Sequence, residues 1–337
     1  MALPIPRSPD RSTARRAATL GLVSVGLVGG YLAGRYLRPP AKLPLPPALD
    51  GTIETLSQPF GTLSYYRGGV VDAAPLLLIH SVNASANAYE VKPLYDHYAK
   101  TRAVYAIDLP GFGFSDRPDR IYTPRLMTDA ILALVEEIRR RHGHFPVDAI
   151  AVSLSSEFLA RAATEHPMTF RSIGLVSPSG FQAARSGDGE PGTTYGRPSV
   201  RDVISFPAWG RGLFDLLVSR ATIRYYLSKT WGSWRIDEGL LAYDYRSAHQ
   251  PGAQHAPFSF LSGFLFSADV LTVYKALILP VFMSHGVRGD FVDFTREVEV
   301  MGLPNWTVRV FQTGALSYFE RLDEFTEAYD AFHDRVA

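Results

Sequence analysis

Residues 147–165, VDAIAVSLSSEFLARAATE, join a strand pattern to a helix pattern across a turn at Ser153. The first part is a short, mostly apolar run, which is typical of a buried strand, and the residues after Ser153 have helical periodicity. Ala151 and Ser155, two positions before and after Ser153, are both small. Strand and helix can therefore approach each other closely, and the stretch predicts a strand–turn–helix unit that presents Ser153.

The same alternation of strand and helix patterns continues along most of the chain. It indicates an α/β protein with a mostly parallel sheet between layers of helices. We expect strands at 63–67, 76–80, 103–108, 147–152, 172–177, 281–285 and 307–312. We expect helices at 87–100, 122–141, 154–165, 294–301 and 322–336.

One long interval between the expected strands interrupts this alternation. It opens with a glycine-rich stretch and continues with closely spaced aromatic residues. Intervals of this length inside a domain are usually functional or carry structure of their own. We expect a mainly helical cap over 181–275, whose aromatic side chains mostly fill its own core. The sheet-centred core then comprises 51–180 and 276–337.

A segment ahead of this core has the composition of a membrane span. Residues 17–34 carry no charged side chain and lie between arginine-containing flanks. Their number is near the minimum for a transmembrane helix, which needs roughly 17 to 25 residues. We therefore expect an uncleaved anchor helix over 17–37. A signal peptide of the twin-arginine kind, suggested by Arg15 and Arg16, and a buried helix of a soluble protein are the alternatives.

The flanks of this segment indicate how it would sit in a membrane. The basic segment 1–16 holds one more basic residue than the flank behind the span, which favours a single-pass protein with its globular part on the non-cytoplasmic side. Prolines crowd the stretch 38–50 and predict a semi-rigid stalk. Gly26, Gly30 and Gly34 recur every four residues and would allow helix–helix association, although glycine is common in such segments.

Composition excludes several classes of protein. The 337 residues include 34 basic and 33 acidic side chains and 46% hydrophobic residues, as in globular chains. A net charge of +1 without a basic block gives no electrostatic footprint for nucleic acid. The absence of cysteine excludes disulfides and thiolate chemistry. Because the sequence has neither a phosphate-binding glycine loop nor metal-ligand spacing, we expect no cofactor and no metal.

Three segments together resemble the α/β-hydrolase superfamily, in particular its cap-bearing branch of esterases, lipases and haloperoxidase-like enzymes. The strand pattern LLLIHSVN at 76–83 is similar to the strand that leads into an oxyanion loop. The stretch DLPGFGFSD at 108–116 is very similar to a D-x-P-G-x-G-x-S loop of this branch. The turn at Ser153 occupies the place of the G-x-S-x-G nucleophile elbow. The resemblance runs from residue 52 to the C-terminus.

The resemblance assigns catalytic roles to individual residues. It implies that Ser153 is the nucleophile and that the backbone N–H groups of Val82 and Leu154 form the oxyanion hole. It implies that Asp290 is the acid, one residue beyond its usual place after the strand at 281–285. Where the family places its base, a histidine, the sequence TGALSYFE at 313–320 has Ala315.

This alanine leaves the mechanism open. A serine hydroxyl is a poor nucleophile without a neighbouring base, and loss of a triad member leaves only about 10³ to 10⁴ over water. His255 or His249 at the end of the cap is a candidate substitute base. Glu157 is another, although a glutamate in the first turn of a helix also meets the helix dipole favourably.

Two functions follow from these residues. The first is a membrane-anchored serine hydrolase, esterase-like or lipase-like, that acts on a small or apolar carbonyl substrate with an unusual base. The second is a catalytically inactive pseudo-hydrolase that binds an apolar, lipid-like ligand or serves as a scaffold. The fold alone cannot separate these two functions.

Overall fold

The structure is a computed structural model that describes residues 43–183 and 187–336. The expected anchor helix at 17–37, the basic segment at 1–16 and the first part of the stalk lie outside the described residues. Within the described ranges, no helix combines the length and the apolar character needed to cross a membrane.

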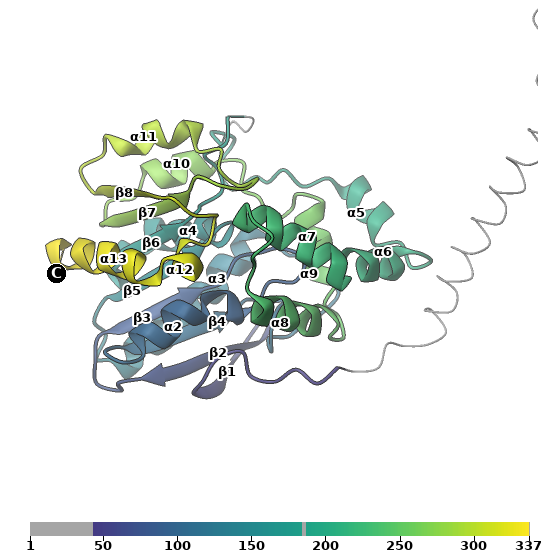
Figure 1. Cartoon of the computed structure of the whole chain (residues 1–337), viewed down its shortest axis with the longest axis horizontal. Coiled ribbons are helices and arrows are strands. Elements are labelled where there is room, and N and C mark those ends of the chain that lie inside the picture. Colours follow the sequence, from purple (N-terminus) through teal and green to yellow (C-terminus); the bar gives the residue numbers. More distant parts are fainter. Residues whose placement is uncertain (1–42, 184–186, 337) are drawn as a thin grey trace, which may run out of the picture.

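A central sheet organises the described residues (Figure 1). Its eight strands follow the order β1-β2-β4-β3-β5-β6-β7-β8. The first two strands form an antiparallel hairpin at one edge, β2 is antiparallel to β4, and all other neighbours are parallel. The strands are β1 (Thr52–Gln58), β2 (Gly61–Gly69), β3 (Pro75–Ile79), β4 (Ala103–Asp108), β5 (Val147–Val152), β6 (Phe170–Val176), β7 (Val281–Gly286) and β8 (Trp306–Phe311).

The seven expected strands are confirmed, and one strand was missed. β1 has the sequence TIETLSQ, and all of its residues are partly or fully exposed. An edge strand with so little buried surface lacks the apolar run that marked the others, so periodicity gave no signal for it. β1 extends the sheet away from the strands that carry the predicted site.

Helices cover both faces of the sheet (Figure 1). Alternate residues of β5 point to opposite faces, as the pleat of a strand requires: Ala149 packs with the helices α3 and α4, whereas Ile150 packs with α2 and α13. The expected helix at 87–100 is a 3₁₀ turn followed by a short α-helix, because Pro93 fits only the first turn of a helix. These elements are η1 (Ala88–Val91), α2 (Lys92–Tyr98), α3 (Pro124–Arg141), α4 (Ser155–Glu165), η2 (Pro167–Thr169), α10 (Val270–Lys275), η3 (Thr295–Glu297), α11 (Val298–Met301), α12 (Ser317–Glu320) and α13 (Leu322–Val336).

The interval between β6 and β7 is mainly helical. Its helices α5 to α9 gather at one end of the sheet in Figure 1. They enclose a small apolar core of their own, which includes Phe214, Ile223, Leu241 and Phe258. α10, at the end of the interval, packs instead against α4 of the sheet's helix layer. The other helices are α5 (Pro198–Ile204), α6 (Gly210–Leu217), α7 (Arg220–Trp231), α8 (Glu238–Ala248) and α9 (His255–Leu261).

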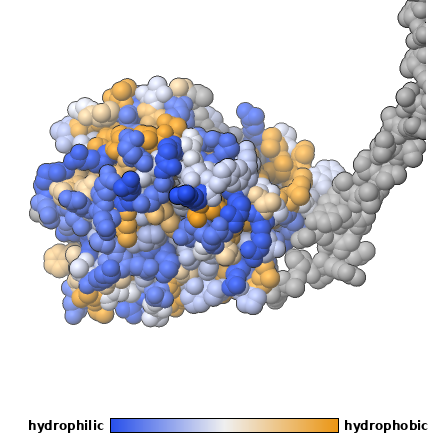
Figure 2. Space-filling view, viewed as in Figure 1, coloured by the Kyte–Doolittle hydropathy of each residue, from blue (hydrophilic) through white to orange (hydrophobic). Residues whose placement is uncertain are grey.

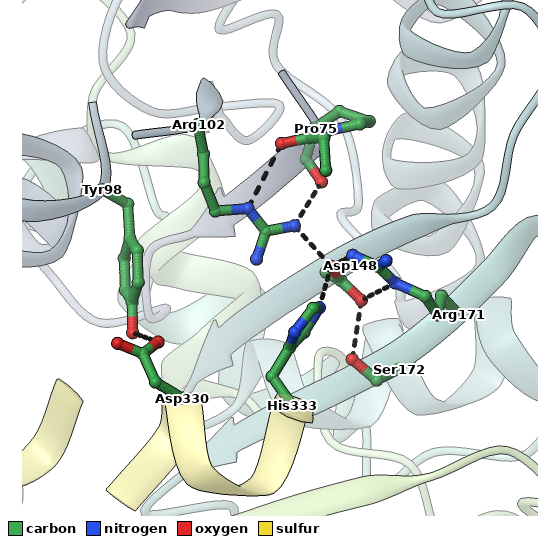
Figure 3. Close-up of polar contacts among 9 residues, drawn as sticks. Pro75, Tyr98, Arg102, Asp148, Arg171, Ser172, Asp330 and His333 are labelled. Atoms are coloured by element: carbon green, nitrogen blue, oxygen red, sulfur yellow. Dashed lines mark hydrogen bonds and ion pairs between the residues drawn. The ribbon is translucent and has the colours of Figure 1, made fainter. Parts of the chain in front are cut away.

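An ionic network holds the sheet at the end of β5 that lies opposite Ser153 (Figure 3). The fully buried Asp148 of β5 forms ion pairs with Arg102 and Arg171. It also accepts hydrogen bonds from the Ser172 hydroxyl at 2.8 Å and from Nε2 of His333 in α13 at 3.0 Å. Burial opposes ionisation of Asp148, yet the hydrogen bonds from His333 and Arg171 and the charge of Arg102 hold its pKa well below the usual range.

Candidate active site

Ser153 stands at a sharp turn between β5 and α4. Its φ angle of +54° is in the left-handed region, which a non-glycine residue adopts only when its surroundings enforce it. The backbone N–H of Ser153 donates to the carbonyl of Val176 at 2.8 Å, and its carbonyl accepts from the N–H of Ser156 at 3.1 Å. The small Ser155 is buried and donates to the carbonyl of His80 at 2.5 Å. The strand–turn–helix unit predicted from the sequence is therefore present.

A cavity of about 540 Å³ opens over this turn. Its volume lies in the range of small-molecule sites, roughly 300 to 1,000 Å³. Apolar side chains such as Leu227, Phe260 and Phe266 form much of its wall. A larger hollow of about 1080 Å³ lies at the opposite end of the sheet, and none of the predicted site residues lines it.

The structure brings five of the predicted site residues to the smaller cavity and leaves three elsewhere. Lining the cavity are Ser153, Val82, Leu154, Asp290 and Ala315. The three candidate substitute bases, Glu157, His249 and His255, do not line it.

The two predicted oxyanion donors are available. The N–H groups of Val82 and Leu154 enter no hydrogen bond with another described residue. Ser81, the residue before Val82, has no left-handed φ, so a side chain is tolerated there. Its backbone N–H and its hydroxyl both donate to the carboxylate of Glu90, at 2.7 and 3.0 Å. That carboxylate therefore fixes the course of the loop.

The loop at 108–116 needs its glycine at Gly113. A Cβ atom there would lie 1.9 to 2.1 Å from the carboxyl group of Asp108. This carboxyl accepts hydrogen bonds from the N–H groups of Phe114 and Ala88, and burial raises the pKa of Asp108 to about 6. The loop is thus built around one buried carboxyl and lies next to the oxyanion loop.

Ala315 lies where the cap meets the core. Its N–H donates to the carbonyl of Thr230 in α7 at 2.9 Å, and its carbonyl accepts from the Ser177 hydroxyl at 2.7 Å. Next to it, a Cβ atom on Gly314 would lie only 2.6 Å from the Thr230 carbonyl. The end of α7 therefore lies directly against the segment that carries Ala315.

Asp290 meets the same end of α7. Its N–H donates to the carbonyl of Lys229 at 3.0 Å, and its carboxylate lies 3.4 Å from the Lys229 ammonium group. The side chain is 56% exposed. Ser153, Ala315 and Asp290 thus share one cavity, and α7 spans the two loops that hold the last two.

The candidate substitute bases have other partners. The carboxylate of the buried Glu157 accepts hydrogen bonds from the Ser179 hydroxyl at 2.5 Å and from the N–H of Ser267 at 2.8 Å. His249 Nδ1 lies 2.6 Å from the Tyr245 carbonyl, and His255 Nδ1 lies 3.3 Å from the carboxylate of Asp119.

No described residue forms a hydrogen bond with the Ser153 hydroxyl. The nearby His80 is held on both sides of its ring, by the Ser81 carbonyl and the Leu109 N–H. Burial lowers the pKa of His80 to about 4, which keeps the ring neutral. His80 therefore braces the two loops, as an interior histidine with both nitrogens occupied does.

Two titratable groups in the cavity wall were not predicted from the sequence, the exposed Asp293 and the buried Glu90. Glu90 is 4% exposed and accepts hydrogen bonds from Ser81 and from Asn83 Nδ2, the latter at 2.8 Å. Burial raises the pKa of Glu90 in spite of these hydrogen bonds. Its only sequence signal was an acidic residue between the apolar Ala88 and Val91, which does not show that it borders a cavity.

A second buried carboxyl, Asp244 of α8, lies next to Glu90 and holds the cap to the oxyanion loop. It accepts from Asn87 Nδ2 at 2.8 Å and from the Ser85 hydroxyl at 3.3 Å. Burial and the nearby charge of Glu90 raise the pKa of Asp244 well above its ordinary value. Acidic groups therefore concentrate on this side of the cavity.

The charge of the cavity wall has one sign. Glu90, Asp290 and Asp293 line the cavity, and no lysine, arginine or histidine is among its described lining residues. A negative group on a ligand would meet these carboxylates, of which Asp290 has a cation beside it, Lys229 at 3.4 Å. An apolar ligand that is neutral or carries a positive charge suits this wall better.

The sheet, the strained serine turn and the helical cap over a cavity define the architecture of α/β hydrolases. The family described as alpha/beta hydrolase fold matches residues 74–216, and the chain has the α/β-hydrolase fold. No curated protein matches the chain.

Several solved structures share this fold at low sequence identity. A serine hydrolase involved in carbazole degradation is 13% identical, with a TM-score of 0.66 over 85% of this chain and 99% of that one. A membrane phospholipase A, a bacterial virulence factor, is 20% identical, with a TM-score of 0.62 over 97% and 99%. An enol-lactonase from Burkholderia xenovorans is 16% identical, with a TM-score of 0.62 over 83% and 100%.

Proposed function

We propose that this protein is a serine hydrolase, esterase-like or lipase-like, that acts at Ser153 on a small or apolar carbonyl substrate. The observation that carries this proposal is the strained turn itself. Ser153 keeps a φ of +54° at the wall of a cavity of about 540 Å³. Such strain is costly, by about 1 to 3 kcal/mol, and is typical of sites where it serves a function.

The geometry supports acyl transfer. A substrate carbonyl whose oxygen lies near the N–H groups of Val82 and Leu154 would have its developing negative charge stabilised by both. The Ser153 oxygen would add to the carbonyl carbon and lose its proton to a base. The leaving alcohol would take up a proton as the acyl-enzyme forms, and water would then release the acid.

We propose Glu90 as the base in place of the histidine that Ala315 replaces. It is a buried carboxyl group in the wall of the Ser153 cavity, and its raised pKa brings it closer to the range in which a base works well at neutral pH. A carboxylate has more acceptor positions than the hydrogen bonds from Ser81 and Asn83 occupy. Glu157, His249 and His255 are weaker candidates because none of them lines the cavity.

The wall of the cavity supports a narrower substrate class. Its aromatic and aliphatic side chains suit an apolar acyl or alcohol group. Its carboxylates oppose a substrate with a negative group near the reacting carbonyl. We therefore propose neutral or cationic esters, and we expect a carboxylate-bearing analogue to react more slowly than its methyl ester.

The membrane anchor remains part of the proposal. It is supported by the charge-free residues 17–34 and the proline-rich stalk. We propose a single-pass protein whose globular part lies on the non-cytoplasmic side, with Gly26, Gly30 and Gly34 available for helix–helix contact. Extraction of the full chain from membranes with alkaline carbonate tests the anchor, because a spanning helix resists that treatment.

A second candidate function is a pseudo-hydrolase that binds an apolar ligand without turnover. The observation that favours it is the Ser153 hydroxyl, which has no hydrogen-bond partner among the described residues. In this case the cavity and the oxyanion donors would bind a carbonyl ligand and leave it intact.

Labelling with a fluorophosphonate probe separates the two candidates. We expect the natural chain to be labelled, Ser153→Ala to lose all labelling, and Glu90→Gln to be labelled much more slowly. Asp293→Asn is a matched control, because this carboxylate also lines the cavity but is exposed. Equal background labelling of the natural chain and Ser153→Ala would reject the hydrolase and leave the binding function.

A further inference from the structure

A face of the cap presents apolar side chains to solvent. Five residues of α5, α6 and the turn between them are 40 to 62% exposed, and they recur every three or four positions. They are Val203, Phe206, Trp209, Leu213 and Leu216. Figure 2 shows apolar residues gathered at this end of the molecule. We call these five residues the cap face.

The cap face is a formed surface. The rings of Phe206 and Trp209 lie 4.5 Å apart between their centroids. The indole N–H of Trp209 donates to the carbonyl of Val203 at 2.8 Å, so the indole ring does not need water for its hydrogen bond. The ring contact and this hydrogen bond therefore hold two exposed aromatic side chains in place.

The helix α6 is apolar on two sides. Phe214 is buried in the cap's own core, whereas Leu213 and Leu216 are 46% and 62% exposed. A surface helix usually has one apolar face and one polar face. Contiguous exposed apolar residues on a second face mark an interaction site with a protein or a membrane.

The course of the chain favours a membrane, rather than a protein, as the partner of the cap face. Leu43, the first described residue, accepts a hydrogen bond from Gln250 at 2.8 Å, and the nearby Gln254 accepts one from Arg211 of α6 at 3.0 Å. The chain therefore joins the globular part at the cap end (Figure 1). Eight residues, 35–42, separate Leu43 from the charge-free segment 17–34, and they can span at most about 29 Å.

We propose that the cap face docks onto the surface of the lipid bilayer that holds residues 17–34. The short connection keeps Leu43, at the cap end, within about 29 Å of the end of that segment. Aromatic and leucine side chains are the residues that enter the boundary between headgroups and acyl chains. Docking would orient the cap toward the membrane, from which an apolar ligand can reach the cavity. This proposal uses the anchor of the proposed function but does not depend on catalysis at Ser153.

Single-cysteine variants test the docking, because the natural chain has no cysteine. Leu213→Cys and Leu216→Cys in the full chain would carry an environment-sensitive fluorophore, in vesicles of phosphatidylcholine and phosphatidylglycerol. Ile278→Cys and Val298→Cys are matched controls, since these apolar residues are 76% and 70% exposed outside the cap face. We expect blue-shifted emission, and its loss in vesicles with spin-labelled lipids, at positions 213 and 216 only.

Three results would overturn the proposal. Emission at 213 and 216 that matches the controls would mean that the cap face remains in water. Protection from iodide without quenching by spin-labelled lipids would mean that residues 1–42 or a second copy of the chain cover it. A chain that does not float with vesicles would mean that no bilayer holds it. Fluorophosphonate labelling of the same samples reports on Ser153 separately, so failure of docking and failure of the proposed hydrolase are distinguishable.

Discussion

Ala315 is the residue on which the proposed mechanism depends most, because the resemblance to α/β hydrolases places a histidine base at this position. Its backbone is held by Thr230 and Ser177, and the residue lines the cavity. We expect Ala315→His to place an imidazole in the cavity that contains Ser153 and to raise the hydrolysis of a short-chain nitrophenyl ester by about 10² to 10⁴, the usual contribution of a general base.

The control for this variant is Ala315→Asn, which adds a polar side chain of similar reach without a base near neutral pH. We expect no gain in rate from the asparagine. An Ala315→His protein that unfolds like the natural chain and yet gains no activity would show that the end of α7 keeps the new imidazole away from Ser153.

The proposed role of Glu90 predicts how the rate depends on pH. A base must be ionised to accept a proton, and burial raises the pKa of Glu90 above its ordinary value. The rate of fluorophosphonate labelling should therefore be low in acid and should rise with pH as Glu90 ionises, through a midpoint above that of a free glutamate. Glu90→Gln should lose this rise, whereas Asp293→Asn should keep it. The same midpoint in Glu90→Gln would exclude Glu90 as the base.

Sequence reasoning named five residues that line the cavity, among them Ser153 and Leu154, but it did not find Glu90. A strand, a small-residue turn and a helix are local patterns, so Ser153 and Leu154 could be placed from their neighbours alone. Glu90 borders the cavity only because the loop at 81–87 folds back onto its carboxylate. That contact depends on tertiary structure, and no local periodicity encodes it.

Among the cap helices, α7 contacts two of the predicted site residues. Its C-terminal end forms backbone hydrogen bonds with Asp290 and Ala315. A Cβ atom on Gly289 would lie 2.2 Å from the Lys229 carbonyl, and the φ of Gly289 is +93°. We expect Gly289→Ala to weaken the attachment of the cap and to lower the free energy of unfolding by about 1 to 3 kcal/mol.

Gly192→Ala is the matched control for this variant. Gly192 also has a left-handed φ, +77°, but no atom lies within 4 Å of a Cβ atom there. The difference between the two variants in urea unfolding isolates the contact with α7, and hydrogen exchange at 229–231 locates it. Equal losses of stability would mean that backbone conformation alone explains the effect and that the contact with α7 adds nothing.

The elements that sequence predicted well are those with a strong apolar signal. The buried strands have nearly uniform apolar runs, and α3 begins at Pro124 after a Thr123 cap, as helix-start rules indicate. β1 is exposed along its length, and α12 has only four residues. Neither has enough buried residues to show a period.

At the scale of the whole molecule, the two ends of the sheet differ: one carries the candidate site and the other carries a buried ionic network. The end at Ser153 carries a strained turn, a cavity and several buried carboxyl groups with raised pKa values. At the opposite end, Asp148 is paired with two arginines and joins β5, β6 and α13 (Figure 3). A strained site needs a rigid frame to enforce it, and the Asp148 network supplies part of that frame.

If the Asp148 network supports the frame, removing the charge of Asp148 should lower the free energy of unfolding substantially. Removing one partner of a buried ion pair costs about 3 to 5 kcal/mol. We expect Asp148→Asn to lie near the lower figure because Arg171 is partly exposed.

The pKa of Asp148 is lower in the folded chain than in the unfolded one. The stability that it contributes is therefore present above the unfolded pKa, about 3.9, and is lost as the pH falls toward the folded value. The difference in free energy of unfolding between the natural chain and Asp148→Asn, measured in urea, should be largest at neutral pH and should shrink below pH 4.

Asp330→Asn is the control, since the Asp330 carboxylate accepts a single hydrogen bond, from Tyr98 at 2.9 Å. This substitution should lower the free energy of unfolding much less. A difference for Asp148→Asn that stays constant down to pH 3 would show that the lost charge is not its cause.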